Sequence, residues 1–115
     1  MVRIVAIKGT KSVTIGTGAT GQSAEIDLKG WSLEAIIMPA DWTAGNLTFL
    51  ASDVSGGTFY DVYDSDGTEL LVSAAEDRAI GLTQAEKAVI RAFRFIKIRS
   101  GTSATPVVQA SSRTL

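Results

Sequence analysis

Cysteine and histidine are both missing from this 115-residue sequence, and each absence excludes a kind of chemistry. Without cysteine the chain has no disulfide, no thiolate metal site and no cysteine nucleophile. Without histidine it lacks the usual general base of serine hydrolases and the commonest metal ligand in proteins. We therefore expect no catalytic residue, no bound metal and no cofactor.

Excess charge of one sign and long apolar runs are missing as well. Lys and Arg number 11 and Asp and Glu 12, so the net charge is −1, which disfavours direct binding to nucleic acid or to anionic membranes. No apolar stretch is long enough to span a bilayer, and residues 1–5 resemble a strand more than a signal peptide. The only local basic run is Arg91, Arg94, Lys97 and Arg99, and from Arg94 on strand alternation is expected to place these charges on one solvated face.

Short strands dominate what is present. Apolar residues make up 45% of the chain, enough for residues 1–115 to form one domain. Alternating or β-branched segments predict strands at 3–7, 11–15, 23–28, 31–38, 46–51, 59–63, 69–72, 93–99 and 107–110. Turns are expected at Gly9-Thr10 and at residues 64–67. The prediction is an all-β fold, an antiparallel β-sandwich or jelly roll of about eight strands, with a polar C-terminal arm from about residue 102.

One segment has helical rather than strand periodicity. Thr83 and Glu86 have the spacing of a capping box, in which each side chain binds the backbone N–H of the other residue. Ala85, Ala88 and Val89 follow at helical spacing. We therefore expect one short helix near residues 84–91.

A glycine motif in the first loop matches the dinucleotide-binding pattern GxGxxG through Gly16, Gly18 and Gly21. That chemistry requires a helix to begin directly after the glycines, so that its N-terminus faces the pyrophosphate. Here the following residues, 23–28, alternate as a strand does. We therefore interpret residues 16–21 as a connecting loop and expect no nucleotide cofactor.

An acidic cluster lies around the predicted turn at 64–67, and its members are Asp61, Asp64, Asp66 and Glu69. An EF-hand calcium loop would need an oxygen ligand two residues before Asp64, where Val62 stands, and a glutamate at its end, where Ser73 stands. We therefore favour a solvated hairpin turn, with a calcium site built by two loops together as the open alternative. An enzyme using Asp61 and Asp64 would need an enclosed carboxylate pair, which we do not expect.

Two aromatic residues are candidates for contacts with a partner or a glycan. Trp42 lies in the loop 39–45, where an exposed indole could stack on a sugar or on a neighbouring subunit; the favoured alternative is that it plugs one end of the fold. Tyr60 alternates with Phe59 and is expected on the surface beside Asp61. The candidate contact residues are therefore Trp42, Tyr60, Asp61 and Asp64.

Two stretches resemble small β-sandwich proteins encoded among the structural genes of tailed bacteriophages and related prophages. They are Ile36 to Thr43 through Leu47 to Ser52, and Arg94 to Thr102 with the closing Ala110 to Leu115. The resemblance covers roughly residues 13–115. It implies a virion component present in many copies and assembled in the host cytoplasm, with no cofactor.

A second likeness concerns the middle of the chain. Residues 49–62, followed by Arg94 to Ile98, are similar to discoidin-like carbohydrate-binding sandwiches, in which an arginine-led strand also lies near the C-terminus. This chain is shorter than most of those domains and lacks their cysteines. The likeness implies a glycan as an alternative ligand.

From these observations we expect a non-enzymatic structural protein of a bacteriophage virion. The leading hypothesis is a capsid decoration (cement) protein or the base of a head fibre, and the alternative is a carbohydrate-binding module of a tail or adhesion device. The expected partners are the major capsid protein or fibre subunits, together with further copies of this chain, for which a trimer is the first candidate. The polar arm is expected to order on a neighbouring subunit.

Overall fold

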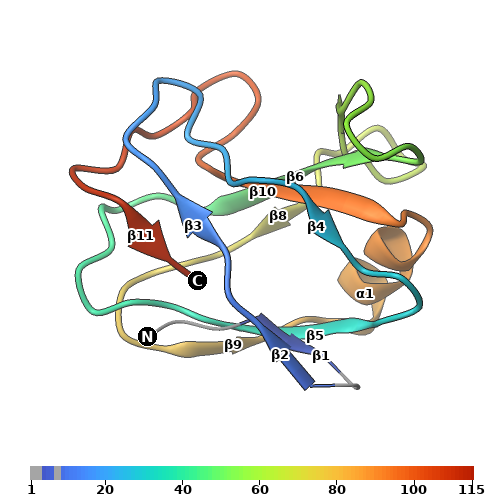
Figure 1. The fold of residues 1–115 in the computed structure, drawn as a ribbon, viewed down its shortest axis with the longest axis horizontal. Coiled ribbons are helices and arrows are strands. Elements are labelled where there is room, and N and C mark those ends of the chain that lie inside the picture. Colours follow the sequence, from blue (N-terminus) through green and yellow to red (C-terminus); the bar gives the residue numbers. More distant parts are fainter. Residues whose placement is uncertain (1–3, 7–8) are drawn as a thin grey trace.

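The computed structural model describes residues 4–6 and 9–115. This part of the chain contains eleven strands and one helix (Figure 1). The four-stranded sheet has the order β2 (Gly9–Lys11), β1 (Ile4–Ala6), β5 (Leu33–Ile37) and β9 (Ala79–Gly81). All of its pairings are antiparallel. Its lower position in Figure 1 leaves one face toward the rest of the molecule.

The five-stranded sheet lies above it in Figure 1 and contains the two longest strands. Its order is β4 (Ile26–Asp27), β10 (Phe95–Ser100), β6 (Leu47–Ser52) and β7 (Tyr60–Asp61), and β8 (Leu71–Val72) also pairs with β6. A separate pair joins β3 (Thr14–Ile15) to β11 (Arg113–Thr114). The protein is thus compact and mostly β, with several antiparallel sheets and one short helix.

One buried apolar cluster joins these elements. β6 and β10 pair along six residues, and alternation turns Phe49 of β6 and Ile98 of β10 into the cluster. Ile36 of β5 and Ile90 of the helix enter the same cluster. Each of these side chains contributes about 1.5–3 kcal/mol through burial. The core therefore holds both larger sheets and the helix together.

The helix α1 (Gln84–Arg91) lies where the sequence predicted it. Thr83 Oγ1 accepts a hydrogen bond from the backbone N–H of Glu86 at 3.2 Å, and Glu86 Oε1 accepts one from the backbone N–H of Thr83 at 2.8 Å. The capping box is therefore confirmed. Ile90 is the buried anchor of the helix.

The N-terminal strand predictions need correction. β1 and β2 pair antiparallel as the expected hairpin does, but Gly9 and Thr10, predicted as its turn, belong to β2, since Gly9 pairs with Ala6 of β1. The predicted strand 11–15 is interrupted, and its two ends pair in different sheets as β2 and β3. Residues 3 and 7 of the first predicted strand lie outside the described residues.

The C-terminal prediction also differs from the structure. Residues 107–110 form no strand, and the last strand is β11. The segment from residue 102, expected as an arm, folds back onto the domain: Leu115 is fully buried and exchanges two backbone hydrogen bonds with Val13, at 2.6 and 2.7 Å. The apolar terminal residue explains this docking, because its burial adds to the core.

Candidate functional site

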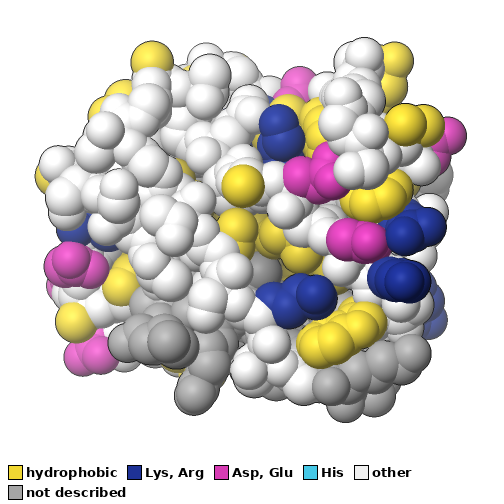
Figure 2. Space-filling model, in the orientation of Figure 1, with side chains coloured by type: hydrophobic (Ala, Val, Ile, Leu, Met, Phe, Trp, Pro, Cys, Tyr) yellow, Lys and Arg dark blue, Asp and Glu magenta, His cyan; other side chains and the backbone are white. Residues whose placement is uncertain are grey.

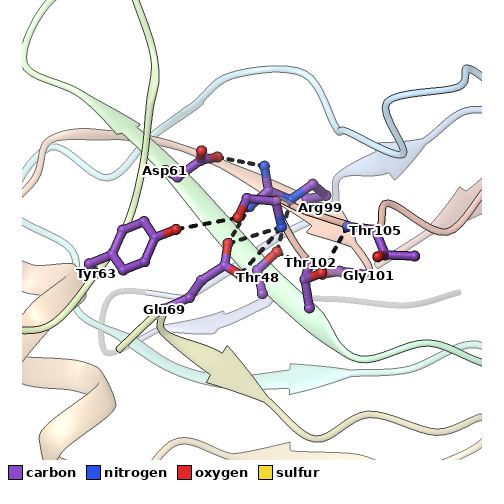
Figure 3. Close-up of polar contacts among 9 residues, drawn as sticks. Thr48, Asp61, Tyr63, Glu69, Arg99, Gly101, Thr102 and Thr105 are labelled. Atoms are coloured by element: carbon purple, nitrogen blue, oxygen red, sulfur yellow. Dashed lines mark hydrogen bonds and ion pairs between the residues drawn. The ribbon is translucent and has the colours of Figure 1, made fainter. Parts of the chain in front are cut away.

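Arg99 of β10 lies at the centre of a buried polar cluster (Figure 3). Its side chain is only 4% exposed. Nε donates to Oγ1 of Thr48, its cross-strand neighbour on β6, at 2.9 Å. Nη1 lies 2.6 Å from Asp61 Oδ1, and Nη2 lies 2.7 Å from Glu69 Oε2. The sequence placed Arg99 on a solvated face, and that prediction is wrong, because two carboxylates cover its guanidinium.

This cluster also fixes the loop that follows β10. Glu69 accepts a hydrogen bond from the backbone N–H of Ser103, and Thr48 Oγ1 donates to the carbonyl of Gly101 at 2.7 Å. Tyr63 Oη lies 3.4 Å from Ser103 Oγ. The Arg99 cluster therefore connects the hairpin at residues 62–70, between β7 and β8, to the chain beyond β10 (Figure 3).

Tyr60 and Tyr63 are exposed along the edge formed by β7 and the hairpin. Their exposed fractions are 69% and 48%, and Leu71 of β8 is also exposed farther along this edge. Both β7 and β8 pair with β6, so the three side chains follow one border of the five-stranded sheet. We call this border the tyrosine edge. The prediction that Tyr60 is a surface residue beside Asp61 is confirmed.

A groove of about 570 Å³ lies beside the tyrosine edge. Tyr60, Tyr63 and Phe93 give it aromatic walls, and Asp53 and Asp61 add carboxylates. Asp61 keeps 40% of its side chain exposed although Arg99 holds one of its oxygens. Aromatic rings beside a carboxylate offer a ligand both an apolar contact and a hydrogen-bond acceptor.

The loop at residues 53–58, which borders the groove, is held by the carboxylate of Glu25, the residue directly before β4. Glu25 accepts hydrogen bonds from the backbone N–H of Gly56 at 2.7 Å and from the hydroxyl of Ser55 at 2.6 Å. These bonds, the Gly56 bond first, lower the pKa of Glu25 below its ordinary value. The loop is therefore fastened to the domain as long as Glu25 is ionised.

Asp64 is occupied by its own turn. Its Oδ1 accepts hydrogen bonds from the backbone N–H groups of Asp66 at 2.9 Å and Thr68 at 3.0 Å. Gly67 has the positive φ of 82° that the turn requires. The hairpin turn is confirmed. Within residues 4–6 and 9–115, no group of three metal-ligating side chains is placed to hold an ion.

Trp42 is too buried for a sugar or a neighbouring subunit to stack on its indole. Only 5% of it is accessible, and its Nε1 donates to the carbonyl of Gly45 at 2.9 Å. The favoured interpretation, that Trp42 is buried in the fold, is confirmed. Of the four candidate contact residues, the structure brings Tyr60 and Asp61 together at the groove, while Asp64 caps its turn and Trp42 is buried.

A second buried polar cluster, centred on Gln109, was not visible in the sequence. Gln109 binds the backbone N–H and C=O of Thr43 and the hydroxyl of Ser100. Arg113 is 7% exposed, donates to Gln109 and lies 2.8 Å from Asp41 Oδ2. These bonds lock the Trp42 loop against the C-terminal segment. Only tertiary folding joins residues so far apart, so no sequence signal could have found them.

Of the three glycines of the motif, Gly21 serves packing, whereas a Cβ at Gly16 or Gly18 would meet no atom within 4 Å. Gly21 has φ of 64°, and a Cβ there would lie 2.9 Å from the carbonyl oxygen of Val107. Gln22, directly after the motif, forms a β-bridge with Arg99. The motif is therefore followed by sheet pairing, and Gly21 permits the C-terminal segment to approach closely.

No protein-family model, curated protein or solved structure gives a significant match to this chain. Among the described helices there is none with the length and hydrophobicity to cross a membrane. The case for a function therefore depends on the surface itself and on the resemblance in the sequence.

Proposed function

We propose that this protein is a non-enzymatic structural component of a tailed-bacteriophage virion, a capsid decoration (cement) protein or the base of a head fibre. The phage-like stretches fall on β6, on β10 and on the C-terminal segment, the parts that hold the fold together. This supports a shared architecture, for which we propose an antiparallel β-sandwich of jelly-roll type. In this proposal the protein resides in the virion and forms homo-oligomers, for which a trimer is the first candidate.

The tyrosine edge is the observation that carries this proposal. A sheet border presents backbone groups to a neighbour, and exposed tyrosines add large, rigid contact area at low entropic cost. Aromatic side chains are enriched at protein interfaces for this reason. We propose the major capsid protein as the occupant, with a fibre subunit in its place if the protein forms a fibre base.

A capsid-binding assay tests the proposal. Purified protein should bind expanded capsids, and Tyr60→Ala combined with Tyr63→Ala should reduce binding at least tenfold, since such anchors contribute 2 kcal/mol or more, roughly, at interfaces. Val108→Ala, at another exposed apolar side chain, is the matched control and should bind as the wild type does. Absence of binding, together with virions that resist heat equally well without the protein, would refute the cement role.

The groove favours a second candidate function, a carbohydrate-binding module of a tail or adhesion device. Tyr60 offers a ring for stacking against a sugar, and the free oxygen of Asp61 offers an acceptor for a hydroxyl. A glycan array should then give hits that Tyr60→Ala removes. An array without hits would eliminate this candidate and leave the capsid proposal standing.

A further inference from the structure

A second concave site, which shares Phe93 with the groove beside the tyrosine edge, lies where the turn between β4 and β5 meets α1. This cleft has a volume of about 720 Å³ and is lined by the turn residues Lys29 and Trp31, by Lys87 and Arg91 of α1, and by Glu34 and Arg94. Figure 2 shows Lys and Arg side chains gathered on this right-hand side of the molecule. Neither proposed function makes use of it.

Positive charge is in excess in the cleft. Of its four cationic side chains, Lys87 is paired with Glu34 at 3.2 Å, and Arg94 binds Asp27 through two bonds of 3.0 and 3.1 Å. Hydrogen bonds from Ser32 and Lys87 lower the pKa of Glu34, so this carboxylate is ionised and already engaged at neutral pH.

Lys29 and Arg91 are the two cations left over. Both are exposed, and neither has a carboxylate within ion-pair distance in the part of the chain that the structure describes. They line the same cleft, one on the turn and one on the last turn of α1. Lys29 attracts Asp27, and Arg91 attracts Glu34, without forming an ion pair. An anion entering the cleft would therefore meet two positive charges that no ion pair holds.

The charge around the cleft contrasts with that of the whole chain, whose net charge is −1. Five of the eleven basic residues line the cleft or lie at its border: Lys11, Lys29, Lys87, Arg91 and Arg94. Only two of the twelve acidic residues, Asp27 and Glu34, accompany them. The remaining chain therefore carries six basic and ten acidic residues. Such a local excess attracts anions to this face.

An aromatic wall stands beside these charges. Trp31 is half-buried in the cleft, with Lys11 Nζ 4.7 Å from its ring centroid. The turn that carries it is tight: Lys29 and Gly30 both have positive φ, and the backbone N–H of Trp31 donates to the carbonyl of Leu28 at 2.6 Å. A non-glycine residue with positive φ is uncommon and persists where the surroundings fix it. The turn thus holds Lys29 and Trp31 in set positions.

We propose that this cleft binds an anionic ligand in which a phosphate, sulfate or carboxylate group is attached to a ring. Arg91 and Lys29 bind the anion, because a guanidinium fork matches the geometry of oxyanions and an ammonium adds a point charge. Trp31 lies against the ring, as aromatic side chains do with flat or apolar ligand faces. An acidic sugar and a nucleotide both present this combination, and a titration separates them.

Titration followed by amide NMR tests the proposal, with glucuronate and adenosine monophosphate as ring-bearing anions and acetate and glucose as partial probes. We expect one ring-bearing anion to shift the amides of Lys29–Ser32 and Lys87–Arg91 and to saturate, at least tenfold more tightly than acetate or glucose. The tighter of the two identifies the ligand source. Saturation by neither would overturn the proposal, and acetate binding as tightly as both would refute the role of the ring.

Variants and salt provide the controls. Arg91→Gln should weaken binding about tenfold, the loss expected for one charge-assisted contact. Arg78→Gln removes an equal charge from an exposed residue outside the cleft and should leave binding unchanged. Raising salt to about 0.5 M should also weaken binding, because both cations are exposed. Equal losses in both variants would show that no specific site exists, and binding insensitive to salt would show that the exposed cations do not hold the anion.

Discussion

The positive charge of Arg99 has a different environment from the charges of Lys29 and Arg91, which line the cleft between the β4–β5 turn and α1. The guanidinium of Arg99 is buried, and two carboxylates and a hydroxyl accept its hydrogen bonds. Lys29 and Arg91 are exposed, and no described carboxylate pairs with them. A charge whose partners are all internal serves the fold, whereas a charge left open at a cleft is free to serve a ligand.

Arg99 is linked to the tyrosine edge, whereas Lys29 and Arg91 do not line the groove beside it. Asp61 belongs both to the Arg99 cluster and to the groove beside the tyrosine edge. The cluster therefore positions Asp61 within the proposed docking surface. Removal of the Arg99 guanidinium should therefore affect both stability and docking, while removal of the charge of Lys29 or Arg91 should affect neither.

The largest expected effect comes from Arg99→Met. It removes a buried cation and leaves unpaired the carboxylate of Glu69, whose side chain is only 15% exposed, so the free energy of unfolding should fall by about 3–5 kcal/mol. Urea denaturation at neutral pH measures this. The double variant Arg99→Met with Glu69→Leu should recover part of the loss, since it no longer buries an unpaired charge. A loss below about 1 kcal/mol would place Arg99 with ordinary surface pairs.

Arg113→Met sharpens the comparison with a buried arginine that has a single carboxylate partner. Asp41 is 69% exposed and regains water when its partner is removed, so the loss should be smaller, about 1–3 kcal/mol. The same denaturation experiment measures it. A loss equal to that of Arg99→Met would show that burial of the cation, and not the number of buried carboxylates, sets the cost.

The exposed carboxylates should produce a smaller effect that depends on pH. The hydrogen bond from Arg94 lowers the pKa of Asp27, and Gly56 and Ser55 lower that of Glu25. Because the folded pKa lies below the unfolded one, the stabilisation is complete above about pH 5 and is lost as the pH falls through the folded pKa. Unfolding curves between pH 7 and pH 2.5 test this. Arg94→Gln should flatten the acid decline, and an identical decline in wild type and variant would contradict it.

The smallest effect is expected from Arg91→Gln. An exposed, unpaired cation contributes little to the fold, so the free energy of unfolding should stay within about 0.5 kcal/mol of the wild type. Urea denaturation measures this alongside Arg99→Met. A loss comparable to that of Arg113→Met would show that Arg91 is a structural charge and would break the contrast.

The elements that sequence reasoning found are those set by local patterns. The helix 84–91 depends on a capping box within four residues, and β10 on alternation along Phe95–Ser100. The hairpin turn at Asp64 likewise depends on one carboxylate and one glycine. Such features carry their determinants within a few residues, so the sequence is sufficient to predict them.

The features that were missed depend on partners far along the chain. β9 is defined by pairing with β5, and β11 by pairing with β3. Arg99 could not be recognised as buried, because alternation places it on the outer face of β10 and only folding brings Glu69 onto it. The candidate site was thus half predicted: Tyr60 and Asp61 were found, and the arginine that positions Asp61 was not.

Cryo-electron microscopy of the intact virion tests the proposed function most directly. We expect density of this domain's size on the capsid, or at a few symmetry-defined fibre sites, with Tyr60 and Tyr63 turned toward the neighbouring protein. The double variant Tyr60→Ala with Tyr63→Ala should lose that density, whereas Val108→Ala should keep it. Virions without such density, or density in which the tyrosine edge faces solvent, would contradict the proposal.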